Sequence, residues 1–151
     1  MPPFKFRLAP ILKLREATQD ERRRELAEAY HVDEVLQARQ TSVNDQLEHL
    51  RQRCRTAARI GTVDVDTLVV AGRHDLLLRA QLRDLAKQRK HVADEIEQRR
   101  ERLIEATQAV RALEKLREKQ LAQHEQTQQR IADKELDEVG VRRWAPREVD
   151  S

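Results

Sequence analysis

The distribution of proline is the feature that most limits how this chain can fold. Its four prolines lie close to the two ends, at positions 2, 3, 10 and 146. The stretch from Ile11 to Ala145 therefore lacks the residue that most strongly interrupts an α-helix. Only three glycines occur, Gly61, Gly72 and Gly140. One long helix can therefore end near Gly61 and a second near Gly140.

The composition favours helices that bury only a narrow strip of side chains. Of the 151 residues, 38% are hydrophobic and 38% are charged, whereas only 3% are aromatic. Globular cores depend on Phe, Tyr and Trp for much of their buried area, so a deep, rounded core is excluded. Ala, Leu, Glu, Gln, Arg and Lys dominate instead, and these residues favour helix.

Apolar residues recur at alternating spacings of three and four in both halves of the chain. The first series is Leu26, Ala29, Asp33, Leu36, Gln40, Val43, Leu47, Leu50, Cys54, Ala57. The second series is Leu68, Ala71, Asp75, Leu78, Leu82, Leu85, Arg89, Val92, Ile96, Arg99, Leu103, Ala106, Val110, Leu113. Such a 3.5-residue repeat keeps one strip of side chains facing a partner helix, as in a left-handed coiled coil. We therefore predict an all-α fold in which two long helices form an antiparallel coiled-coil hairpin.

The expected boundaries follow from the glycines and from the run IGTVDVDT at residues 60–67. This run is rich in β-branched and helix-capping residues, and Thr62 or Asp64 can accept the free amide hydrogens of a following helix. We expect a single coiled-coil hairpin over 1–138 and a flexible C-terminal tail over 139–151. The hairpin would consist of a first helix at about 11–58, a turn at about 60–64 and a second helix at about 64–138.

A turn centred near Thr62 determines which residues face each other. It sets Leu47 near Leu78. At the open end it predicts an apolar clasp, made of Leu8, Ile11 and Leu12 opposite Leu113 and Leu116. The second helix then extends past the first, and we expect residues after about 118 to have no partner within the chain.

The sequence contains no group of residues with the spacing of an active site or a metal site. Its five histidines lack the three- or four-residue spacing by which one helical face binds a metal ion. Phosphate-binding glycine loops, nucleophile elbows and catalytic Cys/His groupings are also missing. Asp64 and Asp66 fit helix capping better than a calcium loop. We therefore expect a protein that is not an enzyme, needs no cofactor and binds no small-molecule substrate.

Charge and cysteine content narrow the choice of partners. The net charge is only +3, from 30 basic and 27 acidic residues, and the two signs alternate in runs such as DERRREL. Nucleic-acid binders usually concentrate Lys and Arg on one face, so we do not expect a nucleic acid as partner. The single Cys54 fits a reducing cytosol, and no apolar run reaches the length of a membrane span. These features favour a cytoplasmic protein.

One apolar group stands outside the coiled-coil pattern. Val69, Val70, Leu76 and Leu77 fall at heptad positions that normally face water, so they form a candidate contact surface for a partner. Alternatively, the register shifts near Gly72 and places part of this group in the seam between the helices. The sequence leaves both interpretations open.

The end of the chain holds a second candidate contact. Arg142, Arg143 and Trp144 form a short basic and aromatic cluster of the kind enriched in binding hot spots. A frayed terminus is the simpler interpretation of this tail, and we favour it.

The opening FKFRLAPILKLRE at Phe4–Glu16, followed by ERRRELAEA at Glu21–Ala29, resembles the N-terminus of the FliJ family of flagellar export proteins. This family is related to type III secretion stalk proteins of the YscO kind. Its members have two long helices, a glycine-containing turn near residue 60 and often a KELDE-like segment, here Lys134–Glu138. The resemblance implies a cytoplasmic component of the flagellar type III export apparatus, peripherally associated with the inner membrane and similar to the coiled coil of a rotary ATPase γ subunit.

The resemblance also implies partners. Family members place their paired termini in the hole of the hexameric export ATPase, contact the membrane export gate protein through the helix after the turn, and escort export chaperones. When the family's gate-binding face is aligned with this chain at the turn glycine, Gly61, it corresponds to Arg73, Leu77, Ala80 and Asp84. Val70 lies one heptad before Leu77. The basic residues that would meet acidic groups of the ATPase ring are Lys5, Arg7, Lys13, Lys115, Arg117 and Lys119.

Two other functions stay open from the sequence alone. The chain could be a generic cytoplasmic coiled-coil scaffold, or the central stalk subunit of a rotary ATPase. Binding to a hexameric export ATPase would distinguish an export protein from both. A hairpin and an extended parallel dimer also stay open, because both use the same heptads.

Overall fold

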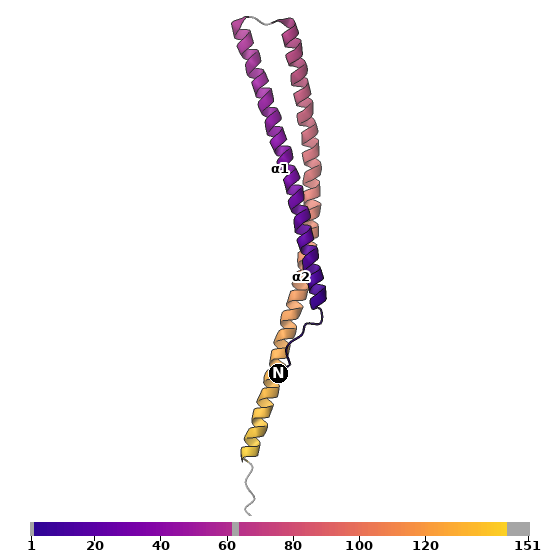
Figure 1. The fold of residues 1–151 in the computed structure, drawn as a ribbon, viewed down its shortest axis with the longest axis vertical. Helices are drawn as coiled ribbons and strands as arrows, with labels where there is room; N and C mark the ends of the chain where they lie inside the picture. Colours follow the sequence, from indigo (N-terminus) through magenta and orange to yellow (C-terminus); the bar gives the residue numbers. More distant parts are fainter. Residues whose placement is uncertain (1, 62–63, 145–151) are drawn as a thin grey trace, which may run out of the picture. The chain divides into compact units, whose positions relative to one another are not determined.

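Two long α-helices make up almost all of the chain in the computed structural model. The structure describes residues 2–61 and 64–144. Helix α1 spans Ala9–Ile60 and helix α2 spans Val65–Trp144, and the described residues contain no strand (Figure 1). The two helices run in opposite directions and pack against each other. The predicted all-α antiparallel hairpin is therefore confirmed.

Both helices extend beyond their predicted ranges. Helix α1 begins at Ala9 and includes Pro10, which is tolerated in the first helical turn because the N–H it lacks would have no partner there. Helix α2 ends at Trp144 rather than near residue 138, so Gly140 lies inside the helix. The first part of the expected tail is thus helical, and residues 145–151 lie outside the described residues.

The turn between the helices uses the predicted glycine. Gly61 has a φ of 73°, a left-handed conformation that costs glycine little because it has no Cβ atom. Asp64 occupies the cap position before α2, where its carbonyl accepts the Leu68 N–H at 3.2 Å. Asp66 lies in the first turn of α2, where the helix dipole favours a negative charge. Thr62, the other predicted cap, lies outside the described residues.

The chain divides into two compact units, each built from parts of both helices. The hairpin unit comprises residues 20–105 and contains the turn. The terminal unit comprises residues 1–19 together with 106–151. The single domain expected over 1–138 stays a prediction.

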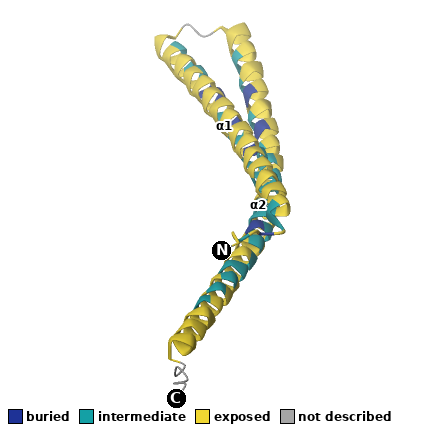
Figure 2. Ribbon diagram, turned by 60° about the horizontal axis from the view of Figure 1, so that its bottom comes forward, coloured by how far each residue is buried: buried dark blue, intermediate teal, exposed yellow. Residues whose placement is uncertain are grey.

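The core of the hairpin unit is one row of side chains between the helices (Figure 2). The buried members are Leu36, Val43, Leu47, Leu78 and Leu85, with Leu50, Leu82 and Val92 packed against them. Leu78 is the most deeply buried, at 1% exposed. Every member belongs to one of the two predicted heptad series, and Leu47 shares the cluster with Leu78 as the register requires. The heptad assignment is therefore confirmed for this core.

A polar layer interrupts the apolar row at Arg89. Its guanidinium donates to the Asp33 carboxylate, with an Nε–Oδ1 distance of 3.1 Å, and to the Gln40 side-chain oxygen at 2.9 Å. All three residues occupy predicted seam positions and are half-buried. Because each finds its partner across the seam in this alignment of the helices, the layer favours this register over shifted ones.

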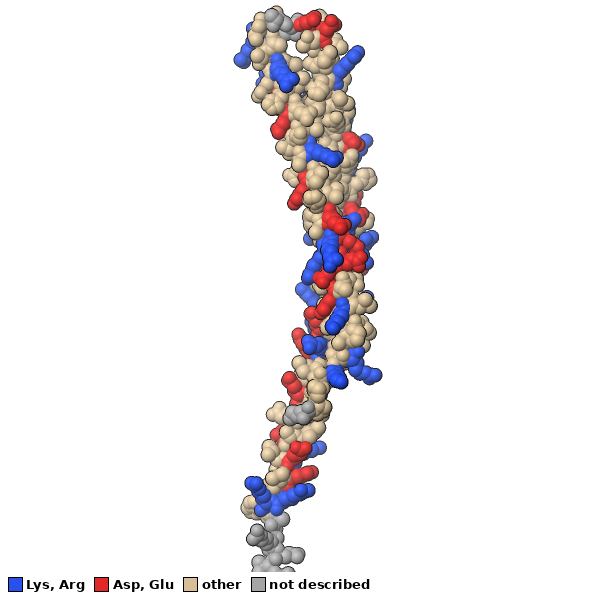
Figure 3. Space-filling model, viewed as in Figure 1, with Lys and Arg blue, Asp and Glu red and all other residues tan. Residues whose placement is uncertain are grey.

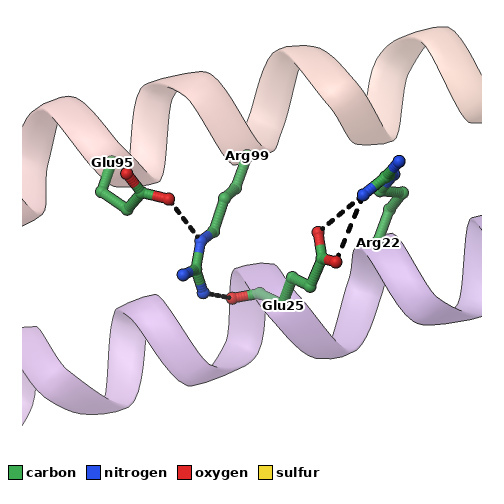
Figure 4. A network of polar contacts seen from close by, with 4 residues as sticks. All are labelled: Arg22, Glu25, Glu95 and Arg99. Carbon is green, nitrogen blue, oxygen red and sulfur yellow. Dashed lines mark hydrogen bonds and ion pairs between the residues drawn. The ribbon is translucent and has the colours of Figure 1, made fainter.

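A second polar contact crosses the seam at Arg99 (Figure 4). Its guanidinium donates to the main-chain carbonyl of Glu25 on α1 and to the Glu95 carboxylate at 2.8 Å. The Glu25 side chain pairs with Arg22 at 3.1 Å. Among the described residues, no buried side-chain nitrogen or oxygen lacks a hydrogen-bond partner. The polar seam residues are thus accommodated without an unpaired buried group.

The seam opens towards the turn. Leu68 was predicted to lie in the seam but is 52% exposed, so that prediction is wrong. In both ribbon views the helices diverge as they approach the turn (Figures 1 and 2). The opposing seam residues here are small, Cys54 and Ala57 on α1 and Ala71 on α2. Small side chains offer little apolar area to bury, so the free energy that holds the helices together is weakest here.

We predict that Leu78→Ala destabilises the protein far more than Leu76→Ala. Leu78 fills the core, and removing a buried leucine side chain typically costs about 2–5 kcal/mol. Leu76 is 66% exposed, so its replacement should change the free energy of unfolding by less than about 0.5 kcal/mol. Urea unfolding followed by circular dichroism measures both values. Equal losses in the two variants would contradict the register.

We predict that replacing the Arg89 layer by leucine stabilises the fold but weakens its specificity. The triple variant Asp33→Leu, Gln40→Leu, Arg89→Leu should raise Tm by roughly 1–4 °C, because a well-packed apolar layer costs no desolvation of charge. The variant should also form concentration-dependent oligomers, because an apolar layer no longer disfavours pairing of these helices in other registers or with other chains. Thermal melting and sedimentation equilibrium test the two effects. A lower Tm with an unchanged monomer would count against this role for the layer.

Candidate partner-binding surfaces

The apolar residues just after the turn face solvent on α2. This apolar stripe consists of Val69 (48% exposed), Val70 (66%), Leu76 (66%) and Leu77 (56%). The alternating residues Ala71, Asp75 and Leu78 are buried or half-buried, as the heptad pattern requires. The register shift that would have placed the stripe in the seam is therefore wrong. The stripe is an exposed surface, as its heptad positions predicted.

Exposed apolar residues on both sides of the turn add to this surface. Ile60 at the end of α1 is 67% exposed, and Val65 at the start of α2 is 71% exposed. Leu68 joins them because the helices diverge there. The sequence pattern missed Leu68, since its heptad position alone assigns it to the seam. On the face drawn in Figure 3, charged side chains are sparser next to the turn than farther along the two helices. Apolar surface gathered in this way is typical of an interaction site.

The four residues that the family resemblance assigns to the export gate, together with Val70 one heptad before Leu77, lie on one face of α2. They are Val70, Arg73, Leu77, Ala80 and Asp84, and all five are exposed. Their spacing of three and four keeps them on one side of the helix over about 21 Å, at 1.5 Å per residue. The face is apolar at Val70 and Leu77, and it carries opposite charges at Arg73 and Asp84. Asp84 also accepts a hydrogen bond from Gln88 at 3.0 Å.

In the terminal unit, the segment before α1 packs on α2. The Phe4 ring lies 5.6 Å from the His124 ring, measured between centroids, and the two planes are tilted by 48°. Phe6 is 9% exposed and Val110 is 4% exposed, and these are the buried hydrophobic residues of the unit among those described. The Ala9 N–H donates to the Phe6 carbonyl at 3.1 Å, so the segment turns directly into α1.

This packing changes two of the expectations for the open end. Of the residues predicted to form the clasp, Leu8, Leu12, Leu113 and Leu116 are half-buried, whereas Ile11 is 44% exposed. The expectation that residues after about 118 lack a partner is wrong as far as His124, which Phe4 contacts. The reason is geometric. The segment before α1 is not helical, and an extended residue advances about 3.3 Å against 1.5 Å in a helix, so the segment reaches farther along α2 than a helical register allows.

The six basic residues proposed to meet an ATPase ring all belong to the terminal unit. They are Lys5, Arg7, Lys13, Lys115, Arg117 and Lys119, and all are exposed. Within the described part of the chain, none of them forms a salt bridge. Glu114 and Glu118 alternate with the three on α2. The unit therefore offers individual cations to acidic partner groups without forming a uniform basic face.

The basic and aromatic cluster lies on the last turn of α2. Arg142, Arg143 and Trp144 are exposed, and Trp144 is 88% exposed. A tryptophan this exposed contributes little packing to the described chain. The Trp144 surface stays a candidate contact for a partner. A frayed terminus, the alternative that we favour from the sequence, also stays a prediction.

The described residues contain no group of three His, Cys, Asp or Glu side chains placed to hold a metal ion. Nor does either helix, over the part that the structure describes, combine the length and the apolar character that crossing a membrane requires. Cys54 is a half-buried free thiol at a seam position.

We predict that Phe6→Ala loosens the terminal unit and leaves the hairpin unit intact. Phe6 is the buried hydrophobic residue of the described N-terminal segment, so its truncation removes apolar area that the segment buries. Amide exchange should accelerate at least about tenfold for residues 106–124, whereas residues 76–92 should keep their protection. Hydrogen exchange with mass spectrometry compares both regions in one sample. The control is Leu14→Ala, since Leu14 is 64% exposed. Equal acceleration in both regions, or in the control, would refute this anchoring role.

Comparison with known protein families matches residues 4–148 to the family described as Flagellar FliJ protein. The match extends over nearly the whole chain of 151 residues and includes both units. No curated protein and no solved structure matches this chain.

Proposed function

The chain belongs to the FliJ family of flagellar export proteins, and from this premise we propose that it acts by binding other proteins of the export apparatus and not by catalysis. The partners in this proposal are the hexameric export ATPase, the membrane export gate protein and export chaperones. Its place is the cytoplasm, at the periphery of the inner-membrane export apparatus. The observation that carries the proposal is the solvent-exposed apolar stripe on α2, whose residues lie outside the seam between the helices.

The gate protein is proposed to bind the face of α2 that carries Leu77. Leu77 and Val70 are more than half exposed, and burying such a side chain in an interface contributes about 1.5–3 kcal/mol. Arg73 and Asp84 flank this apolar pair and can orient the partner through charge. Apolar residues surrounded by polar ones are the usual arrangement of a binding hot spot.

We predict that Leu77→Asp abolishes gate binding without affecting folding. The introduced carboxylate would be desolvated in the interface at a large cost, whereas in the free protein it faces water. Affinity for the cytoplasmic part of the gate protein, measured by calorimetry, should fall at least about tenfold. Thermal melting should stay at the wild-type value. The matched control is Leu136→Asp, because Leu136 is 69% exposed but belongs to the terminal unit. Undiminished affinity of Leu77→Asp, or equal loss in the control, would refute the assignment.

The export ATPase is proposed to bind the terminal unit. The unit brings the N-terminal segment and the second half of α2 together, and its six basic side chains are exposed. In a ring with acidic groups around its hole, these cations would be attracted individually, and the interaction would weaken with rising salt. The contact of Phe4 with His124 holds the N-terminal segment on α2. The basic residues near the N-terminus and those on α2 therefore belong to one unit.

We predict that Lys115→Glu with Lys119→Glu reduces the stimulation of ATP hydrolysis by the export ATPase. Reversing two charges in an electrostatic contact should lower the apparent affinity at least about fivefold, most strongly at low salt. The matched control is Lys87→Glu with Lys90→Glu, which makes the same change in the hairpin unit. Steady-state hydrolysis titrated with each variant gives the comparison. Identical curves for wild type and Lys115→Glu with Lys119→Glu would exclude these residues from the ATPase contact. Chaperone binding rests on the family alone, and no surface is assigned to it.

A further inference from the structure

The divergence of α1 and α2 next to the turn leaves an apolar groove between them. Two cavities open on its two sides, with volumes of about 360 and 310 Å³. They share a floor made of Leu50, Cys54, Leu68 and Ala71. In the space-filling view an opening separates the two helices close to the turn (Figure 3). The hairpin unit therefore has unfilled apolar space where its seam ends.

The larger cavity is the more apolar of the two and defines the turn groove. Its lining adds Ala57, Thr67 and Val70 to the floor, with Arg53 and His74 as its basic groups. The lining contains no carboxylate. Only Val70 belongs also to the apolar stripe, and Leu77 lies outside the groove. The turn groove thus overlaps the face proposed for the export gate at Val70 but does not include Leu77.

The charge around the turn groove favours an acidic occupant. Arg53 stands at its edge and has no ion pair among the described residues. On the other side of the seam, Arg51 and Arg55 line the smaller cavity together with Asp75. That carboxylate is already paired with Arg79 at 2.8 Å. The side chains that line the two cavities therefore carry more positive than negative charge, so electrostatic complementarity favours negative charge on the partner.

The shape of the turn groove favours a helix. Its floor lies between two helices, and a third helix packs into such a depression with interaxial distances of about 8–10 Å. An amphipathic helix presents apolar side chains on one face at i, i+3 and i+4, and such a face can pack on a floor made of one turn of each helix. A membrane surface is broad and would meet the outward residues Leu76 and Leu77 before the floor at Cys54. A second copy of this chain would bring another excess of arginines to the same place.

We propose that the turn groove binds an acidic amphipathic helix of a partner protein. The apolar face of this helix packs on Leu50, Cys54 and Leu68, and its carboxylates meet Arg53 at the edge. The proposal does not rest on the assignments made for the export gate and the export ATPase, because the groove shares only Val70 with the gate face and lies outside the terminal unit.

The single Cys54 on the floor of the groove provides a direct readout. The probe is a synthetic helical peptide of roughly 18 residues, five turns, with leucines on one face and glutamates on the other. Saturating peptide should slow alkylation of Cys54 by a maleimide at least about tenfold, since a packed helix excludes the reagent. The same peptide with lysines in place of its glutamates should leave the rate unchanged. Equal protection by both peptides would refute charge selection.

Two variants test the groove itself. Ala57→Trp fills the turn groove and should weaken binding of the fluorescein-labelled glutamate peptide at least about tenfold. Arg53→Glu changes only an exposed side chain, so it cannot unfold the seam, and it should weaken binding at least about threefold. The matched control Arg83→Glu, on an exposed site of α2, should bind as wild type. Circular dichroism of each variant establishes that the helices are retained.

Four outcomes would overturn the proposal. The first is absence of peptide binding at any accessible concentration. The second is equal affinity in wild type, Ala57→Trp and Arg53→Glu. The third is protection of Cys54 that rises with protein concentration without peptide, together with a dimer in sedimentation, which would assign the groove to a second copy. The fourth is protection by vesicles of anionic lipid equal to that by the peptide, which would assign the groove to a membrane surface.

Discussion

Packing of one row of apolar side chains between two antiparallel helices is the interaction on which the rest of this structure depends. With 3% aromatic residues, the chain has little else to bury, and no isolated helix of this composition is stable in water. Leu47 and Leu78 belong to this row, and Leu78 is its most deeply buried side chain. Because burial in the hairpin unit follows this row, each helix there turns the rest of its circumference to solvent, and that surface is available for partners.

The polar layers in the seam show how a uniform heptad pattern yields one arrangement. A row of leucines alone would tolerate sliding by a heptad, since every shifted register buries similar area. Arg89 with Asp33 and Gln40, and Arg99 with the Glu25 carbonyl, are satisfied together in the observed alignment. These contacts are half-buried and add little to stability, but a shift would leave them without partners. These polar contacts therefore select the alignment of α1 and α2, and this alignment determines which residues of the hairpin unit face solvent.

The two ends of the seam differ in chemistry, and the difference accounts for the candidate binding surfaces. At the turn, small residues face one another, the helices diverge, and apolar side chains such as Leu68 and Val70 become accessible. In the terminal unit, an extended segment carrying Phe4 and Phe6 packs on α2. The hairpin unit thus offers apolar surface and an apolar groove, and the terminal unit offers exposed cations. In the proposed function, these chemically different surfaces would serve different partners of the export apparatus.

The sequence by itself determined the two helices, the glycine at the turn and the heptad core, because proline spacing and apolar periodicity are local properties of the chain. It also identified the apolar stripe, since Val69 to Leu77 breaks the period in a visible way. It could not decide whether that stripe was exposed, nor that Leu68 leaves the seam, because both depend on how far apart the helices stand near the turn. The sequence pattern predicted that α2 has no partner after about residue 118, whereas Phe4 contacts His124. The pattern missed this contact because it does not show where the N-terminal segment leaves the helical conformation. Helix separation and the reach of the N-terminal segment are properties of packing between distant residues, and only the tertiary structure decided them.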